Sequence, residues 1–201
     1  MNLDFSDRNS YWYIASYPKS GNTWCRLFIS QFLKDKLSHE DKNNIVSEDI
    51  FDIKTGLMAS SMEWLNDQFG IDCEYLRWEE LDKYRSKLNN NIPVFSQYYN
   101  YHKVHDAFIS PDSGNKPILP LQNCNGVIYL IRNPIDIVVS LSYFFGWEFE
   151  KALSFLLDKD ASLCETKVKG SPQVRQFLGS WDYHVNSWTS QNKVPLLIIK
   201  Y

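Results

Sequence analysis

The hydrophobic residues of this chain fall into short apolar runs and into series with helical spacing. Residues 11–16 form a β-rich apolar run, which Pro18, Ser20 and Gly21 interrupt. From Thr23 onward apolar side chains recur at helical spacing, at Trp24, Leu27, Phe28, Phe32 and Leu33. The pattern therefore predicts a strand, a tight loop and then a helix.

The middle of the chain gives a less regular pattern. Residues 35–58 are polar and show no clear period. The segments 61–69 and 74–88 each carry a charged face and an apolar face, which predicts two helices. Residues 94–104 are aromatic and β-prone, whereas three prolines and a glycine mark 110–122 as a loop.

The second half of the chain begins with an uninterrupted apolar run at 126–131, which is typical of a strand covered on both faces. Asn133-Pro134 then supplies an N-cap and a first helical residue, and helix-spaced apolar residues follow as far as position 141. Further helices are predicted at Phe149–Leu157 and 174–190, and another buried strand at 195–200.

Strands that alternate with helices favour an α/β fold with a mainly parallel central sheet flanked by helices. At 201 residues, with no internal repeat, the sequence gives no reason to expect more than a single domain over 1–201. Ligands of such folds bind outside the carboxyl ends of the strands. Three groups of polar or aromatic residues fall at such ends: 19–23, Arg132 and Tyr201.

Composition narrows the class of partner. The net charge of −3 argues against a protein that mainly coats nucleic acid or anionic lipid, so any anion site must be local. No stretch approaches the ~18 apolar residues of a membrane span, and the acidic first residues do not resemble a secretory signal. The four scattered cysteines favour free thiols in a reducing compartment over a disulfide framework. We therefore expect a cytoplasmic protein.

The segment 17–24, Tyr-Pro-Lys-Ser-Gly-Asn-Thr-Trp, joins the first strand to the first helix. Gly21 allows the backbone N–H groups to turn inward at a helix N-terminus, and Lys19, Ser20 and Thr23 add a cation and two hydroxyls. Such a loop suits a dianionic phosphate or sulfate. Because the lysine precedes the glycine, it is not the phosphate loop of nucleotide kinases and NTPases, which disfavours those activities. An ordinary turn with a solvated lysine is the alternative.

A second anion site is indicated after the strand at 126–131. Arg132 ends that strand before a helix N-terminus, where a guanidinium can bind phosphate through two hydrogen bonds. Ser140 lies two turns into the helix and can present a hydroxyl to the same anion. The alternatives are an ion pair between Arg132 and Asp136 and a solvated helix serine.

The segment 101–106, Tyr-His-Lys-Val-His-Asp, offers a general base. In an extended chain Lys103 and His105 share one face, and His102 points to the other. The histidine can take a proton from a hydroxyl, and the lysine can neutralise developing negative charge. The alternatives are a surface histidine without a role and a metal site on both histidines, which lacks a clear third ligand.

Taken together, these segments resemble the PAPS-dependent sulfotransferase family, where PAPS is 3′-phosphoadenylyl sulfate. Segment 17–24 resembles the 5′-phosphosulfate loop Tyr-Pro-Lys-Ser-Gly-Thr-Thr-Trp, from which Asn22 departs. Residues 132–140 resemble the 3′-phosphate segment Arg-Asn-Pro-x-Asp-x-x-x-Ser, and 103–105 resemble Lys-Thr-His. The Asn22 amide keeps a donor, so we expect an altered phosphate contact there.

The resemblance implies a P-loop-like three-layer fold and transfer of a sulfuryl group from PAPS to a hydroxyl or amine of a small acceptor, without a metal. The catalytic residues it implies are His105 as base with Lys19, Lys103 and Ser140. The residues that it implies for binding PAPS or its product PAP are Lys19, Ser20, Gly21, Asn22, Thr23, Trp24, Arg132, Ser140 and Tyr201. Core packing is the alternative for the two aromatic residues, and 35–125 are expected to build the acceptor pocket.

The resemblance covers nearly all of this chain, but only about the first two-thirds of a typical family domain. The Arg-x-Gly loop that completes the family's 3′-phosphate site does not occur in the sequence. A catalytically inactive nucleotide-binding or interaction domain derived from a sulfotransferase is therefore the alternative to an active enzyme.

Overall fold

A central parallel sheet organises the fold in the computed structural model, which describes residues 10–36, 57–88, 101–165 and 171–201. Its five strands follow the order β2-β3-β1-β4-β7, and every neighbouring pair is parallel. Their bounds are β1 (Tyr11–Ser16), β2 (Leu57–Met58), β3 (Tyr101–Val104), β4 (Cys124–Ile131) and β7 (Leu196–Lys200). The predicted mainly parallel α/β sheet is confirmed, and the strand predicted at 126–131 begins two residues earlier.

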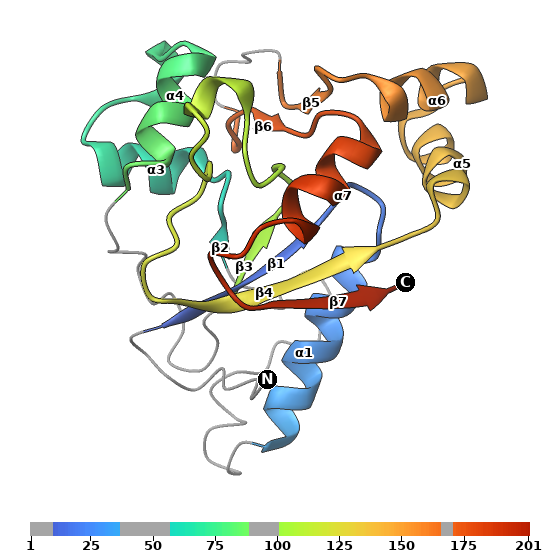
Figure 1. Ribbon diagram of the computed structural model, residues 1–201, viewed down its shortest axis with the longest axis horizontal. Helices are drawn as coiled ribbons and strands as arrows, with labels where there is room; N and C mark the ends of the chain where they lie inside the picture. Colours follow the sequence, from blue (N-terminus) through green and yellow to red (C-terminus); the bar gives the residue numbers. More distant parts are fainter. Residues whose placement is uncertain (1–9, 37–56, 89–100, 166–170) are drawn as a thin grey trace.

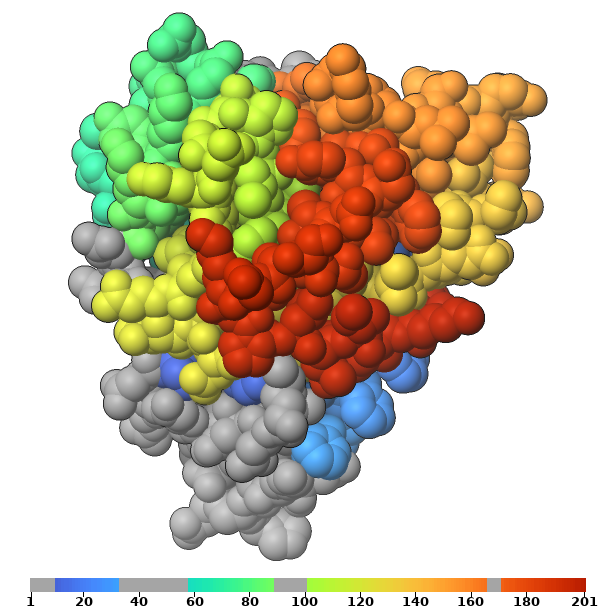
Figure 2. Space-filling model, in the orientation of Figure 1, coloured from blue at the N-terminus to red at the C-terminus, as the bar shows by residue number. Residues whose placement is uncertain are grey.

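Helices cover both faces of the sheet (Figure 1). Alternate residues of β1 point to opposite sides: Ile14 packs with Ile29 of α1 (Asn22–Lys36), whereas Tyr13 lies in the core cluster that contains Trp188 of α7 (Trp181–Thr189). The sheet is therefore the middle of three layers, as predicted. In the space-filling view, the red residues of α7 and β7 lie at the surface of one face of the molecule (Figure 2).

Four more helices of the described residues pack at the margins of these layers. α3 (Met62–Phe69) and α4 (Trp78–Arg85) share one cluster, while α5 (Pro134–Phe145) and α6 (Phe149–Leu157) pack together against the loop after β1. Short 3-10 turns occur at Cys73–Tyr75 and Pro111–Ser113. Asn133 caps α5 as predicted, because its side chain accepts a hydrogen bond from the Ile135 N–H at 3.0 Å.

Two of the predicted helices are wrong in extent. The segment 74–88 is a 3-10 turn followed by the separate helix α4, because Leu76 and Arg77 are extended. In 174–190 only α7 is helical. The residues before it contain β6 (Gln176–Phe177), which pairs antiparallel with β5 (Ser162–Leu163).

Two further expectations concern regions that the structure describes only in part. Of the β-prone stretch 94–104, the strand is observed at Tyr101–Val104, and 94–100 lie outside the described residues. Among the helices of the described ranges, none is long and apolar enough to cross a membrane.

Candidate functional site

The carboxyl ends of β1, β3, β4 and β7 meet at one edge of the sheet and open into a cleft of about 690 Å³. Residues that the sequence places far apart therefore become neighbours. The predicted site residues that line the cleft are Lys19, Gly21, Asn22, Thr23, Trp24, Lys103, His105, Arg132, Ser140 and Tyr201. Ser20 is the one predicted site residue that does not line it.

The loop after β1 brings a cation to the cleft through an unusual backbone. Lys19 has a φ of 66°, which L-residues rarely adopt, and Gly21 has a φ of 89°. The Lys19 ammonium lies 3.8 Å from the centroid of the Phe144 ring on α5, so it is directed across the cleft. Burial and then the nearby Arg132 lower the pKa of Lys19. An arriving anion opposes this shift, because a nearby negative charge favours the protonated lysine.

The side chains of Ser20 and Asn22, which were expected to contact a phosphate, both point into the protein. Ser20 is 1% exposed, and its Oγ has no hydrogen-bond partner in the part of the chain that the structure describes. The Asn22 amide instead turns inward and donates to the carbonyl of Ile14 at 2.9 Å. The expected phosphate contact from the Asn22 side chain is therefore not available in this arrangement.

Arg132 joins the two predicted anion sites. Its Nη1 donates to the Lys19 carbonyl at 2.8 Å, which connects the end of β4 to the loop after β1. Its guanidinium also lies 5.1 Å from the centroid of the Tyr201 ring. Among the ion pairs of the described residues none joins Arg132 to Asp136, so that alternative is not realised. Ser140 lines the same cleft from α5.

The geometry of His105 defines its tautomer. Nδ1 lies 2.8 Å from the carbonyl oxygen of Ser16, and because a carbonyl can only accept, Nδ1 carries the proton. The Nε2 lone pair then remains, without a partner among the described residues. Burial and then the charge of Lys103 lower the pKa of His105 to about 3, so the ring is neutral at pH 7. A neutral imidazole with a free Nε2 can accept a proton.

Lys103 lines the cleft with His105, as the alternation along the strand predicts. Burial and then Arg26 lower the pKa of Lys103 to about 8, which leaves it mostly charged at pH 7. His102 is on the opposite side, where its ring centroid lies 5.3 Å from that of Tyr11 and 6.1 Å from that of Tyr13. The two histidines therefore do not converge on one point, which contradicts the metal-site alternative.

Buried residues that the sequence did not reveal hold the backbone around His105. His184 Nε2 donates to the His105 carbonyl at 2.9 Å, and its Nδ1 accepts from the Tyr129 hydroxyl at 2.8 Å. Burial lowers the pKa of His184 to about 4, so this ring is also neutral. On the next residue, both Asp106 oxygens accept hydrogen bonds of 2.8 Å from Arg85, which is fully buried. No local motif predicts these partners, because they are distant in sequence.

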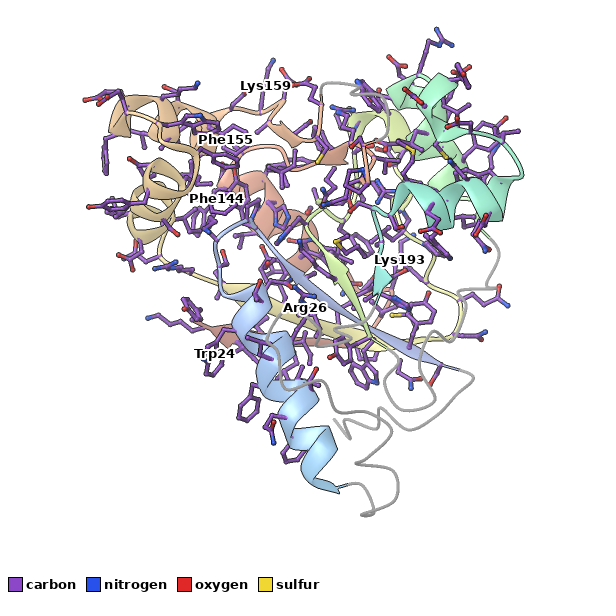
Figure 3. All side chains as sticks on the ribbon, turned by 180° about the vertical axis from the view of Figure 1, so that it is seen from behind. Trp24, Arg26, Phe144, Phe155, Lys159 and Lys193 are labelled. Carbon is purple, nitrogen blue, oxygen red and sulfur yellow. The ribbon has the colours of Figure 1, made fainter. Side chains whose placement is uncertain are left out.

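The two aromatic residues of the prediction are exposed rather than packed in the core. Trp24 is 59% exposed and Tyr201 is 51% exposed, and their ring centroids are 6.3 Å apart at an interplanar angle of 63°. Figure 3 shows Trp24 on the outer side of α1. The Tyr201 ring also packs so closely over Gly21 that a Cβ there would overlap it. Core packing is therefore wrong for both, and their rings can receive a planar ligand.

Within the described residues, most of the remaining wall of the cleft comes from outside the segment 35–125, of which 37–56 and 89–100 lie outside the description. Of the described residues within 35–125, only Lys103 and His105 line the cleft. The other wall is formed by α5 and by the β5–β6 region, with the residues Phe144, Phe145, Leu163, Cys164, Gln173 and Gln176. This wall combines apolar rings with two side-chain amides.

Comparison with known proteins gives one family and a set of similar solved structures, two of which are described here. A family model described as a sulfotransferase domain matches residues 11–201. A mouse sulfotransferase complexed with PAP is 19% identical over 98% of this chain and 53% of that chain, with a TM-score of 0.47. Retinol dehydratase in a complex with retinol and PAP is 14% identical over 96% of this chain and 55% of that one, with a TM-score of 0.44.

The chain thus spans about half the length of these two structures, less than the two-thirds expected from the sequence. A search of curated proteins gave no match.

Proposed function

The chain belongs to the sulfotransferase domain family, and on this premise we propose that it binds PAPS and directs its sulfuryl group to a hydroxyl or amine of a small acceptor. The observation that carries the proposal is the convergence of two anion-suited strand ends in one cleft. Lys19 and Arg132 come from different strand ends and are tied by the hydrogen bond to the Lys19 carbonyl. A ligand with two separated phosphate groups matches this pair of cations.

The residues around these cations fit the phosphosulfate end of such a donor. The loop after β1 offers backbone N–H groups at the start of α1, together with Lys19. The buried hydroxyl of Ser20, unpartnered within the described ranges, is the kind of group that a bound anion satisfies. Thr23 is exposed at the first turn of α1 and lines the cleft. Gly21 and the N–H of Asn22 belong to the same cradle in the proposal.

The other phosphate and the base have separate partners. Arg132, just before α5, and Ser140, two turns into that helix, are proposed to hold the 3′-phosphate. Trp24 and Tyr201 present exposed rings beside the same loop, and we assign the adenine to them. PAPS supplies the reactive sulfuryl group when it is bound.

His105 is the proposed general base. Its Nε2 takes the proton of the acceptor as the acceptor atom bonds to sulfur and the bond between sulfur and the 5′-phosphate oxygen breaks. Lys103 shares the cleft with His105 and is mostly charged at pH 7, so it can stabilise the sulfuryl oxygens. Lys19 is proposed to stabilise the departing phosphate, with Ser140 assisting from α5. The scheme uses no metal.

Calorimetric titration with PAP tests the donor site without requiring turnover. We expect micromolar binding by the parent and about ten- to a hundredfold weaker binding by Arg132→Ala and Lys19→Ala, since each loses a charge-assisted hydrogen bond. Lys159→Ala is the matched control, because Lys159 is exposed beyond α6 and does not line the cleft (Figure 3). A folded parent that does not bind PAP would contradict the proposal.

Turnover is measured separately, by transfer of labelled sulfuryl from PAPS to a panel of phenols, alcohols, sugars and amines. Product formation that is lost in His105→Gln supports the enzyme. PAP binding without any product supports the inactive nucleotide-binding alternative.

A further inference from the structure

The side chain of Asn22 is fully used inside the protein. Asn22 is the first residue of α1 and is buried. Its Nδ2 donates to the Ile14 carbonyl at 2.9 Å and to the Ser16 Oγ at 3.2 Å. Its Oδ1 accepts a hydrogen bond of 3.0 Å from Nε of Arg26. Both amide hydrogens and the amide oxygen therefore have partners, and the side chain ties α1 to the end of β1.

The next link of this network reaches the proposed base. The Ser16 carbonyl accepts the His105 Nδ1 hydrogen at 2.8 Å, and the Ser16 Oγ lies 3.3 Å from the same nitrogen. Ser16 is thus held by Asn22 on one side and holds His105 on the other. Because Ser16 fixes which ring nitrogen carries the hydrogen, whatever orients Ser16 also orients the Nε2 lone pair.

Arg26 completes the network from beneath the cleft. It is buried one helical turn after Asn22, and Figure 3 shows it on the side of α1 that faces the sheet. It is not among the residues that line the cleft, so it has no direct path to a ligand there within the described part of the chain. Its hydrogen bond to Asn22 gives it an indirect route to the reacting groups.

We propose that Asn22 and Arg26 are a pair of positioning residues, which hold Ser16 and through it fix the His105 ring with Nε2 toward the reacting hydroxyl or amine. The inference rests on the function proposed above, in which His105 is the base. It also gives a reason for asparagine at a position where the resemblance leads one to expect threonine. A threonine hydroxyl has one donor, so it cannot donate to both Ile14 and Ser16 as the Asn22 amide does.

The tautomer of His105 is the deciding measurement, and it requires neither ligand nor turnover. In a ¹⁵N-labelled protein, long-range histidine NMR spectra distinguish protonated Nδ1 from protonated Nε2, and His105→Gln assigns the signal. We expect the parent to hold the Nδ1–H form and Asn22→Leu to show a mixture of both forms. Asn66→Leu is the control, because its Oδ1 also holds a backbone N–H, that of Cys73 at 2.8 Å, but in α3. That control should leave the His105 signal unchanged.

Binding and turnover then separate positioning from general damage. PAP affinity should stay within about threefold in Arg26→Leu, because Arg26 does not line the cleft, while kcat falls about tenfold, a fraction of the 10²–10⁴ that a general base supplies. Asn22→Leu should lower kcat to the same extent, and the double variant should be little worse than either single one. If Asn22→Leu does not fold, Asn22→Asp keeps the shape and the acceptor but removes both donors.

A His105 signal that stays purely Nδ1–H in every folded variant at positions 22 and 26 overturns the inference. The tautomer measurement does not depend on the donor site. If the parent does not bind PAP, the proposed function is wrong, but the tautomer result remains valid.

Discussion

Acidification from pH 7.5 to 5.0 should weaken the fold chiefly through two buried histidines. His105 and His184 are held neutral, with folded pKa values of about 3 and about 4 against the ordinary 6.5. Between those limits the unfolded chain binds more protons than the folded one, so stability is lost as the pH falls below 6.5. At pH 5.0 each ring contributes a loss of about 2 kcal/mol, since one pKa interval is worth about 1.4 kcal/mol.

The expected loss of about 4 kcal/mol is a large part of the ~5–15 kcal/mol that stabilises a typical domain. Urea unfolding at the two pH values, followed by circular dichroism, measures it directly. His105→Gln and His184→Gln should each remove about half of the pH dependence, whatever their stability at pH 7.5. A parent that loses less than 1 kcal/mol, or two variants with the parent's full pH dependence, would refute the assignment of neutral buried rings.

Three further results are expected. The kcat/KM for PAPS should fall above pH 8, roughly tenfold by pH 9, as Lys103 loses its proton, and Lys103→Arg should move this fall to higher pH. In urea unfolding, Arg85→Leu should lower the free energy of unfolding by about 3–5 kcal/mol, because it leaves the buried Asp106 carboxylate without its ion-pair partner. Arg77→Leu, which breaks an exposed ion pair with Glu80, should change the free energy of unfolding by less than about 1 kcal/mol. Gly21→Ala should weaken PAP binding in calorimetry at least about tenfold, whereas Gly70→Ala, equally left-handed but with open space around it, should leave binding intact.

The central sheet was predictable because strands buried on both faces leave continuous apolar runs. β1 and β4 show this pattern, and the polar loops after them carry the motifs of the cleft. The error at 174–190 has the same physical origin. Val174, Phe177 and Leu178 are spaced as on a helix, yet each packs in a different core cluster of the fold. The spacing of apolar residues predicts which side chains are buried, but it does not predict which other elements they pack against.

The candidate site divides in a similar way. Lys19, Arg132 and His105 sit in local motifs, and each motif predicts its own chemistry. The inward turn of Asn22 and the support from His184 depend on partners in other elements, for which local spacing carries no signal. The sequence therefore predicts the residues proposed to react with or bind the ligand. Only the structure reveals the residues that hold them in position.

The Tyr201 ring that packs over Gly21 has a consequence for how the protein is made. The loop after β1 is synthesised early. The Tyr201 ring that packs over it is synthesised about 180 residues later. Because β7 must also pair with β4 before that ring can settle, the loop after β1 acquires its final shape late in folding. On the proposed function, nascent chains that end before β7 should bind PAP more weakly than the 201-residue chain, so ligand affinity can report the pairing of β7 with β4.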